Sequence, residues 1–175
     1  MSQILLAFST VDGHTLKICQ RIRGVLEAGG HRVTLLEITD AEFPDCSTFD
    51  KIVLGASVRY GRHRKSVYDF IDHHLALLQS APSAFFSVNV VARKVGKDTA
   101  DGNPYIKAFR RLSGWSPRVI AVFAGKIDYP RYSRIDRMVI RFIMWMTRGP
   151  TDPRASVEFT NWVAVDAFAG EVSRM

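Results

Sequence analysis

The sequence predicts an α/β fold built on a doubly wound parallel sheet of five strands in the order 2-1-3-4-5. Five short apolar runs alternate with segments whose apolar side chains recur at helical spacing, and polar loops follow several of the runs. Strands that alternate with helices form a parallel sheet covered on both faces, and five of them favour this strand order. A length of 175 residues predicts a single domain, residues 1–175, with a sizeable core.

The first half of the chain supplies three strands and one helix. Residues 3–8 (QILLAF) form an apolar run that ends in a polar turn, and residues 15–28 then carry apolar side chains at helical spacing. Two glycines at positions 29 and 30 end this helix. Residues 32–38 (RVTLLEI) and 51–56 (KIVLGA) are rich in branched aliphatic side chains, which favour strands.

The second half continues the alternation. We expect helices over residues 65–78 and 104–112, strands over 83–88 (SAFFSV) and 118–124 (RVIAVFA), and a short strand over 156–159. A final helix is expected over residues 161–172, with Thr160 as its N-cap.

Residues 125–153 do not fit the alternation and form an insertion after the fifth strand. Within it, residues 134–148 read RIDRMVIRFIMWMTR. On a helix, at about 100° per residue, the four arginines share one stripe and the remaining surface is almost entirely apolar. The helix would be about 20 Å long, too short to cross a hydrocarbon core of about 30 Å.

Three explanations fit this basic amphipathic insertion. A helix lying in a membrane interface would reach lipid phosphates with its arginines and hold Trp145 at headgroup depth. Alternatively, Met138, Phe142 and Met146 pack on the protein, or the helix forms a homo-oligomer interface. The residues expected at a membrane are Arg134, Arg137, Arg141, Trp145 and Arg148.

Charge and cysteine content narrow the class of protein. The formal net charge is +7, with 24 Lys and Arg against 17 Asp and Glu, so the surface favours anionic partners. Cys19 and Cys46 have no metal or redox spacing and fit a reducing compartment. We find neither a signal peptide nor an uncharged apolar run long enough to span a membrane. We expect no metal and no nucleic-acid partner.

Three unusual loops follow the first, third and fourth strands, where ligands of such sheets bind. Residues 9–15 (STVDGHT) combine hydroxyls and a glycine at a helix start, which favours a phosphate; ordinary helix capping is the alternative. Residues 57–62 (SVRYGR) offer Tyr60 and Gly61 to a flat ring, or form a surface turn. Residues 89–94 (NVVARK) add amides and a cation, or form a solvated loop.

Together these loops favour a phosphorylated flat cofactor, most simply FMN. A phosphoacceptor receiver domain is a poor fit, because Ala56 and Ser57 stand where that class of protein carries a carboxylate after its third strand.

Four segments carry a resemblance to a known family over nearly the whole chain. They are FSTVDGHT at 8–15, LGASVRYGRH at 54–63, PSAFFSVNVVARK at 82–94 and AGKIDYPRYSRIDRMVIRFIMWMTRGPTD at 124–152. The chain resembles the flavodoxin-like, quinone-dependent (menaquinone-dependent) protoporphyrinogen IX dehydrogenases, or oxidases, of bacteria. The resemblance implies a flavodoxin-like sheet with a long helical insertion after strand five. It also implies FMN-dependent, six-electron oxidation of protoporphyrinogen IX to protoporphyrin IX in haem biosynthesis.

The family's electron acceptor is a membrane quinone, menaquinone or ubiquinone. The resemblance therefore implies a peripheral protein on the cytoplasmic face of the inner membrane. Bound flavin carries the redox chemistry in such enzymes, and we assign no catalytic side chain.

The resemblance also implies where ligands contact the chain. The FMN phosphate is expected at residues 9, 10 and 13–15, and the ring between residues 57–61 and 87–93. The expected cofactor residues are Ser9, Thr10, Val11, Asp12, Gly13, His14, Thr15, Ser57, Val58, Arg59, Tyr60, Gly61, Ser87, Val88, Asn89, Val90, Ala92 and Arg93. The cations expected to meet the substrate propionates are Arg59, Arg93, Arg131 and Arg134.

Asp12 departs from ordinary flavodoxins, which usually carry Thr at this position. A carboxylate facing the phosphate would repel it. We therefore expect Asp12 to point away and to accept hydrogen bonds from backbone N–H groups of its own turn.

Three rival functions remain open on the sequence. One is a flavodoxin-like quinone reductase with another electron donor. A second is a non-catalytic flavodoxin electron carrier that docks a protein partner through the inserted helix. A third is a basic adaptor that binds anionic lipid or RNA without a cofactor.

Overall fold

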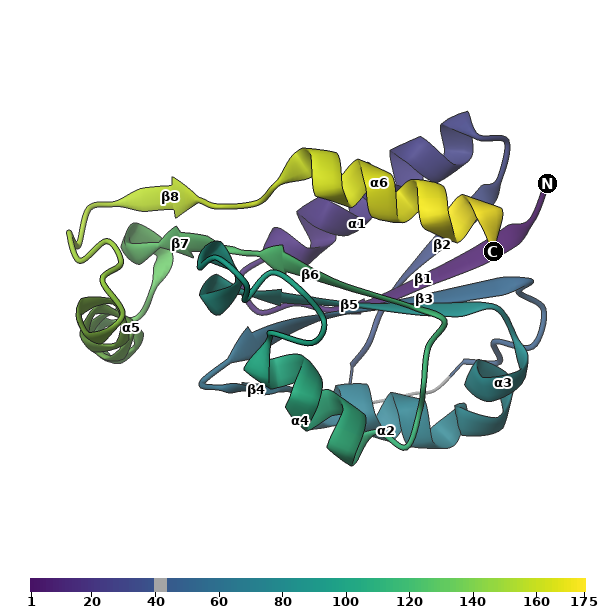
Figure 1. The fold of residues 1–175 in the computed structure, drawn as a ribbon, viewed down its shortest axis with the longest axis horizontal. Helices are drawn as coiled ribbons and strands as arrows, with labels where there is room; N and C mark the ends of the chain where they lie inside the picture. Colours follow the sequence, from purple (N-terminus) through teal and green to yellow (C-terminus); the bar gives the residue numbers. More distant parts are fainter. Residues whose placement is uncertain (40–43) are drawn as a thin grey trace.

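A parallel sheet forms the centre of the molecule in the computed structural model, which describes residues 1–39 and 44–175 (Figure 1). Its strands are β1 (Gln3–Ser9), β2 (Arg32–Glu37), β3 (Lys51–Arg59), β5 (Ser83–Asn89) and β6 (Val119–Ala124). They are arranged β2-β1-β3-β5-β6, which confirms the predicted order 2-1-3-4-5. The short strand β4 (Arg62–His63) pairs antiparallel with the end of β3 and was not expected.

Helices cover both faces of this sheet (Figure 1). One face carries α1 (His14–Ala28) and α6 (Trp162–Arg174), and the other carries α2 (Lys65–His73), α3 (Leu75–Ser80) and α4 (Pro104–Leu112). Each face has its own apolar core: Ile18 and Phe168 belong to the first, and Phe85 and Phe109 stack in the second with ring centroids 3.9 Å apart. Side chains on both faces of the central strands are buried, as a doubly covered parallel sheet requires.

Two local expectations are wrong. The helix expected over residues 65–78 is interrupted at His74, whose ring lies 4.6 Å from that of Phe70 and contacts the thiol of Cys46. The φ and ψ angles of His74 (−104° and 16°) are not those of an α-helix, and its side chain is buried. The last helix is capped by Asn161, which accepts from the Ala164 N–H, and not by Thr160. The Thr160 hydroxyl instead donates to the Ala124 carbonyl at 2.7 Å.

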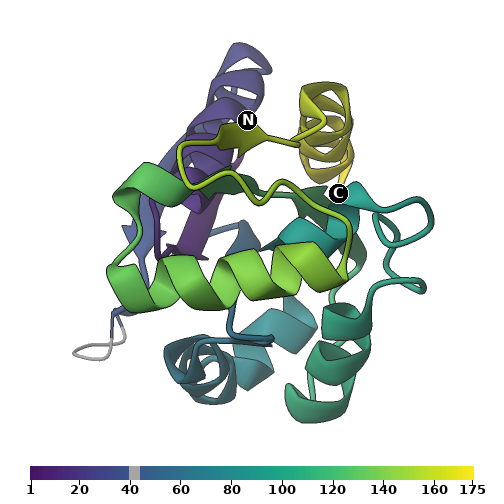
Figure 2. The ribbon, with the colours of Figure 1, turned by 90° about the vertical axis from the view of Figure 1, so that its left-hand side faces the viewer.

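The helical insertion expected after the fifth strand is present. It comprises β7 (Lys126–Asp128), the short 3-10 helix η2 (Tyr129–Arg131) and α5 (Arg134–Met146), and returns through β8 (Ser156–Glu158). Strands β7 and β8 pair antiparallel, so the chain leaves and re-enters the fold at neighbouring positions. Figure 2 shows α5 lying across the edge at which the parallel strands end.

The ends of α5 have local causes. The Ser133 side chain accepts from the Asp136 N–H at 3.1 Å and caps the first turn. The helix ends at Met146, two residues earlier than expected, because Arg148 adopts a left-handed conformation (φ 54°) and the Gly149 N–H donates to the Met144 carbonyl at 2.7 Å. This 6→1 bond is a standard helix termination.

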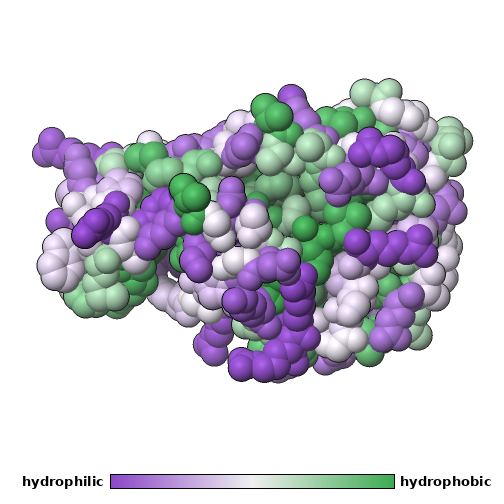
Figure 3. Space-filling model, viewed as in Figure 1, coloured by the Kyte–Doolittle hydropathy of each residue, from purple (hydrophilic) through white to green (hydrophobic). Residues whose placement is uncertain are grey.

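The apolar surface of α5 is divided between two faces. Met144 is buried and Ile140 is half-buried against a small core containing Tyr129 and Tyr132. The outer face exposes Ile135, Met138, Phe142, Trp145 and Met146, each 58–70% accessible. The alternative in which Met138, Phe142 and Met146 pack on the protein is therefore wrong, and Figure 3 shows hydrophobic atoms at this end of the molecule.

No helix within residues 1–39 and 44–175 combines the length and apolarity needed to cross a membrane.

Candidate functional site

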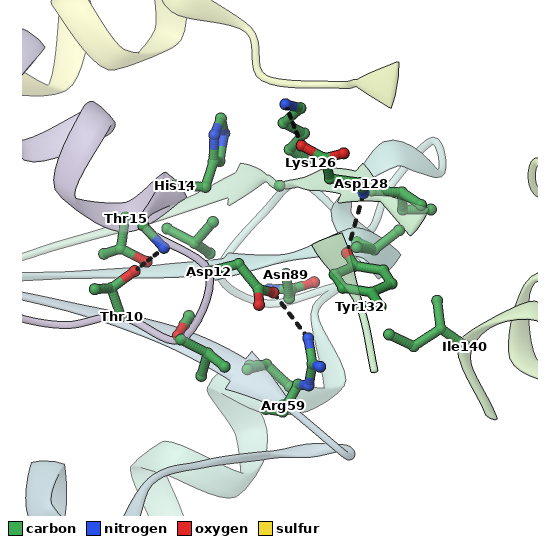
Figure 4. Close-up of a pocket in the computed structure, with 18 of the residues that line it drawn as sticks. Thr10, Asp12, His14, Thr15, Arg59, Asn89, Lys126, Asp128, Tyr132 and Ile140 are labelled. Carbon is green, nitrogen blue, oxygen red and sulfur yellow. Dashed lines mark hydrogen bonds and ion pairs between the residues drawn. The ribbon is translucent and has the colours of Figure 1, made fainter. Parts of the chain in front are cut away.

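A cavity lies between the carboxyl ends of the parallel strands and α5 (Figure 4). All three loops singled out in the sequence contribute to its lining. The expected cofactor residues that line it are Thr10, Val11, Asp12, Gly13, His14, Thr15, Ser57, Val58, Arg59, Tyr60, Gly61, Val88, Asn89 and Val90. Four expected residues do not line it: Ser9, Ser87, Ala92 and Arg93.

The loop between β1 and α1 offers donors that the protein does not use. Gly13 is the N-cap of α1 with φ 81°, and no side chain caps this helix, which contradicts the ordinary capping alternative. Ser9 and Thr15 are each 1% exposed, and their hydroxyl oxygens have no hydrogen-bond partner among the described residues. Leaving a buried polar group unpaired is costly. Free hydroxyls beside an uncapped helix N-terminus therefore fit a phosphate group.

Asp12 does not make the bonds expected of it. Its carboxylate accepts from the Arg59 guanidinium at 2.8 Å, while the nearby Gly13 N–H donates to the Thr10 hydroxyl at 3.0 Å. The expected bonding to its own turn is therefore wrong. The physical reason is the burial of Arg59, whose side chain is only 17% exposed. Burying a guanidinium group without a counter-charge costs more free energy than leaving backbone N–H groups of an exposed turn to water.

Arg59 also reaches the insertion. Its guanidinium lies 3.1 Å from the carboxylate of Asp136 in the first turn of α5, and the Tyr60 hydroxyl donates to the same carboxylate. The set Asp12, Arg59 and Asp136, called the Arg59 bridge below, thus connects two cavity loops to α5. Because both Arg59 partners are carboxylates of the protein, the expectation that Arg59 meets a substrate propionate is not supported by this geometry.

The loop between β3 and β4 is a tight hairpin. Tyr60 and Gly61 both have positive φ, 51° and 77°, as the two central residues of a type I′ turn do. The turn places the Tyr60 ring at the cavity, 59% exposed. An exposed ring at a cavity rim suits stacking on a flat ligand.

The third loop is held by a buried amide network. The Asn89 side-chain oxygen accepts from the Ala92 N–H at 3.0 Å and from the Asn103 amide at 3.2 Å, and its amide donates to the Ser87 hydroxyl at 3.3 Å. The His63 ring lies 2.9 Å from the same hydroxyl through Nε2. Ser87 and Ala92 are therefore buried behind the residues that line the cavity, and they support its wall.

Sequence reasoning missed His63 and Asn103. Burial lowers the pKa of His63 to about 4, so its ring is neutral near neutral pH. Asn103 also caps α4 by accepting from the Tyr105 N–H at 3.0 Å. Their distance from Asn89 along the chain hides this network, since only the fold brings the three side chains together.

His14 lines the cavity but is turned toward the segment between β8 and α6 (Figure 4). Its Nε2 lies 2.7 Å from the Thr160 hydroxyl. Because that hydroxyl donates its own proton to Ala124, it accepts from His14, which fixes the proton of a neutral His14 ring on Nε2. Burial lowers the pKa of His14.

The four arginines expected at the substrate occupy different places. Arg93 does not line the cavity; it donates to the Val90 carbonyl at 3.1 Å and to the carbonyl and hydroxyl of Thr147 at 3.0 and 2.9 Å. It joins the 3-10 helix η1 (Val90–Arg93) to the end of α5. Arg134 lies on the outer side of α5, and Arg131 lines the cavity.

The insertion supplies a further wall of the cavity. The lining residues beyond the expected cofactor residues are Lys17, Val91, Tyr105, Gly125, Lys126, Ile127, Asp128, Arg131, Tyr132, Ile140, Ile143, Met144 and Glu158. Those from Gly125 to Met144 belong to the insertion, and Arg131 is the one that the sequence predicted, as a substrate contact. Helical periodicity predicted a wide apolar surface on this helix, but it did not show which part of that surface faces the fold. The inward face brings Ile140, Ile143 and Met144 to the cavity, which suits an apolar ligand.

Most charges around the cavity are already neutralised. Lys17 pairs with Glu158 at 2.7 Å and Lys126 with Asp128 at 2.7 Å, and Arg59 is held in its bridge. Arg131 lines the cavity without a carboxylate partner among the described residues. Among the basic residues that line the cavity, Arg131 is therefore the one that can pair with an anionic ligand.

Comparison with known proteins agrees with this architecture. The flavodoxin domain family matches residues 5–154, a range that includes α5. The chain is also 40% identical over 98% of its length to the protoporphyrinogen IX dehydrogenase [quinone] of Escherichia coli (strain K12), and covers 94% of that protein. The chain belongs to this flavodoxin-like dehydrogenase family. The resemblance and the oxidoreductase class predicted from the sequence are confirmed.

A second relative in the dehydrogenase family comes from Leishmania major. It is 40% identical over 98% of this chain, which covers 74% of that protein. Among solved structures, an oxidised flavodoxin 1 from Bacillus cereus aligns with a TM-score of 0.58 at 16% identity, covering 99% of this chain and 98% of that one. An archaeal flavodoxin gives a TM-score of 0.56 at 10% identity, covering 98% and 96%. These two structures support the fold alone.

Proposed function

We propose that the chain binds FMN in this cavity and oxidises protoporphyrinogen IX to protoporphyrin IX. Six electrons and six protons leave the substrate, and three molecules of a membrane quinone are reduced to quinol. The observation that carries the proposal is the pair of buried, unpaired hydroxyls of Ser9 and Thr15 at an uncapped helix N-terminus, in a chain 40% identical to enzymes named for this reaction.

The residues of the first two loops fit FMN. The cavity-lining hydroxyls of Thr10 and Thr15, with the first amides of α1, would hold the phosphate, and Tyr60 with the wall formed by Val88 and Val90 would border the ring. Bound FMN supplies a two-electron acceptor that passes electrons on to the quinone. Arg59, held by Asp12 and Asp136, keeps the Asp12 carboxylate neutralised beside this site.

The insertion would bind and orient the substrate. Ile140, Ile143 and Met144 form an apolar wall that excludes water, and Arg131 would receive a substrate carboxylate through charge-assisted hydrogen bonds. Of the four arginines expected at the propionates, Arg131 is the one that this geometry favours.

The proposal includes a peripheral position on the cytoplasmic face of the inner membrane, in the service of haem biosynthesis. The exposed apolar face of α5 supports it, because contiguous exposed apolar side chains mark interaction surfaces. A water-insoluble quinone would then reach the cavity from the adjacent bilayer.

Anaerobic turnover tests the redox proposal. Purified, FMN-loaded protein is mixed with protoporphyrinogen IX and a soluble quinone analogue, and porphyrin fluorescence is followed. We expect fluorescence to appear with three quinols formed per porphyrin. A Thr15→Val variant, which removes one phosphate-directed hydroxyl and keeps the side-chain shape, should take up FMN more weakly.

The outcomes separate the rivals. Protein that takes up no FMN would overturn the redox account and favour a basic adaptor. FMN-loaded protein that reduces quinone with another donor, but forms no porphyrin, would indicate a quinone reductase. Loaded protein that exchanges electrons only with a protein partner would indicate an electron carrier.

A further inference from the structure

A shallow groove runs along the outer flank of α5, on the side of the helix turned away from the cavity. Its lining is Arg134, Arg137, Met138, Arg141, Phe142, Trp145 and Thr151. The groove therefore combines three guanidinium groups with three large apolar side chains, and no acidic residue is part of its lining. We call it the arginine groove.

Two of the arginines are fixed by backbone carbonyl groups. Arg137 donates through Nε to the Tyr129 carbonyl at 3.1 Å, and Arg141 donates through Nε to the Thr151 carbonyl at 2.8 Å. These bonds orient both guanidinium groups while using only part of their five donors. The remaining N–H groups are pre-positioned for an anion, and a pre-organised donor loses less entropy on binding.

The three arginines of the groove carry positive charge without an ion-pair partner in the described part of the chain. None of Arg134, Arg137 and Arg141 forms an ion pair with any residue in 1–39 or 44–175. The one acidic residue of α5, Asp136, is engaged by Arg59 and Tyr60. Like charges three or four residues apart on a helix destabilise it, so an anion bound between these arginines would relieve the repulsion.

We propose that the arginine groove binds the phosphate of an anionic phospholipid headgroup. A free phosphate would account for the arginines alone. Met138, Phe142 and Trp145 are 67%, 58% and 70% exposed on the same flank, and lipid chains would cover them. Arginines beside an exposed tryptophan match the border between headgroups and hydrocarbon. The inference rests on the membrane part of the proposed function and is independent of its redox part.

The same charges oppose a second copy of the chain as the occupant. In a two-fold dimer each patch meets the identical patch. Pairing the arginine groove with itself would bring six guanidinium groups together without an acidic partner.

Vesicle binding tests the inference with the full-length, FMN-loaded protein. Flotation is measured with vesicles of phosphatidylcholine alone and of phosphatidylcholine with phosphatidylglycerol. We expect strong partition onto the anionic vesicles. Arg134→Gln should weaken it roughly fivefold, and the triple change Arg134→Gln, Arg137→Gln and Arg141→Gln about 100-fold, from the usual contribution of one basic residue near an anionic leaflet.

The matched control removes the same charge elsewhere. Lys107, Arg111 and Arg118 are exposed, form no ion pair among the described residues and lie outside the groove. Their triple change to Gln should leave partition onto anionic vesicles at the wild-type level. An equal loss in this control would show that net charge alone drives binding, and would overturn the inference.

Two variants distinguish a loss of lipid binding from a loss of folding. Arg137 and Arg141 hold the backbone, so the triple variant is checked by circular dichroism and FMN uptake. Arg134→Gln removes no backbone bond found in the structure, and its loss of partition must therefore come from the groove. The pair Arg137→Lys and Arg141→Lys keeps the charge but loses the fixed planar donors, and should bind more weakly than wild type.

Other occupants give recognisable results. If inorganic phosphate at equal ionic strength displaces the protein from vesicles while chloride does not, the site takes free phosphate and the inference fails. A dimer in analytical ultracentrifugation that Trp145→Ser dissociates would assign the face to a second copy, and would also overturn it. Porphyrin formation with a soluble quinone but no vesicle binding would reject the groove alone, whereas vesicle binding without porphyrin formation would reject the redox proposal alone.

Discussion

Arg131 differs from the other cations of the cavity because it forms no ion pair with a carboxylate within residues 1–39 and 44–175. Lys17, Lys126 and Arg59 are each held within 2.8 Å of an acidic side chain. A substrate carboxylate that approached one of them would have to displace that partner, whereas at Arg131 it would meet an available guanidinium group. If the chain acts as proposed, we expect Arg131 to be the cation that recognises the charge of the substrate in this cavity.

We expect Arg131→Gln to raise KM for protoporphyrinogen IX about tenfold or more, the usual effect of losing a hydrogen bond to a charged group, with kcat little changed. The dimethyl ester of the substrate, which lacks carboxylates, should show no such rise. Steady-state kinetics with both substrates checks this, with Arg134→Gln as the control because Arg134 does not line the cavity. Equal rises for acid and ester would contradict a carboxylate contact.

His63 gives a pH dependence of stability. Burial lowers its pKa from 6.5 to about 4, so between these values the unfolded chain binds more protons than the folded one. The free energy of unfolding must then fall as the pH falls through this window. Between about pH 7 and pH 5, we expect the His63→Gln variant to lose about 2 kcal/mol less of its free energy of unfolding than the wild type does. The contributions of His14, His31 and His74, whose pKa values are also lowered, remain in both proteins. Urea unfolding of the wild type and the variant at the two pH values measures this difference. If both proteins lost the same free energy of unfolding between the two pH values, the prediction would be contradicted.

At the scale of elements, the ring of Phe86 on β5 lies over the backbone of β3 and requires a glycine at position 55. A Cβ atom on Gly55 would lie 2.2 Å from Cζ of Phe86, and Phe86 is itself buried against Phe123 and Phe168. The aromatic ring packed over Gly55, and not a special backbone conformation, explains this residue.

We expect Gly55→Ala to lower the free energy of unfolding by about 1–3 kcal/mol, the usual effect of overpacking a core. Gly24→Ala is the matched control. Gly24 lies inside α1 with open space around it, and alanine there should raise stability by about 0.5–1 kcal/mol. Chemical denaturation of both variants tests the pair; a harmless Gly55→Ala would show that Phe86 can move aside.

The elements show how far sequence reasoning reaches. The five parallel strands were predictable because their apolar runs are bounded by polar turns, and α4 was predicted with its exact bounds, Pro104–Leu112. The break at His74 was not, because it depends on a ring entering a core built by distant residues. Strand β4 was also missed, since two residues paired through a turn carry no periodic signal.

The candidate site divides in the same way. The loops at residues 9–15 and 57–61 were found because hydroxyls, glycines and an aromatic residue are visible in a short stretch. The Arg59 bridge and the network of His63, Asn89 and Asn103 were not, because each joins residues far apart in the chain. The side-chain partners of Arg93 and Ser87, which the sequence did not predict, also depend on the fold.

For the whole molecule, the cavity makes folding and ligand binding interdependent. Its lining residues range from Thr10 to Glu158. A ligand there therefore contacts residues that come together only when the chain is folded. We expect free FMN at about 100 times its Kd to raise the free energy of unfolding by roughly 2.7 kcal/mol. Thermal unfolding with and without FMN tests this, with riboflavin as the control that lacks the phosphate. Equal stabilisation by both would contradict a phosphate site at Thr10 and Thr15.

The pairing of β7 with β8 has a consequence for how such a chain could arise or be re-engineered. Because the two strands lie side by side, Ile127 beside Val157, the excursion starts and finishes at almost the same point in space. An insert joined in this manner needs only one attachment point on the parent fold, because β7 and β8 form a two-stranded sheet of their own. Its length and composition can therefore change without a change in the strand order of the main sheet.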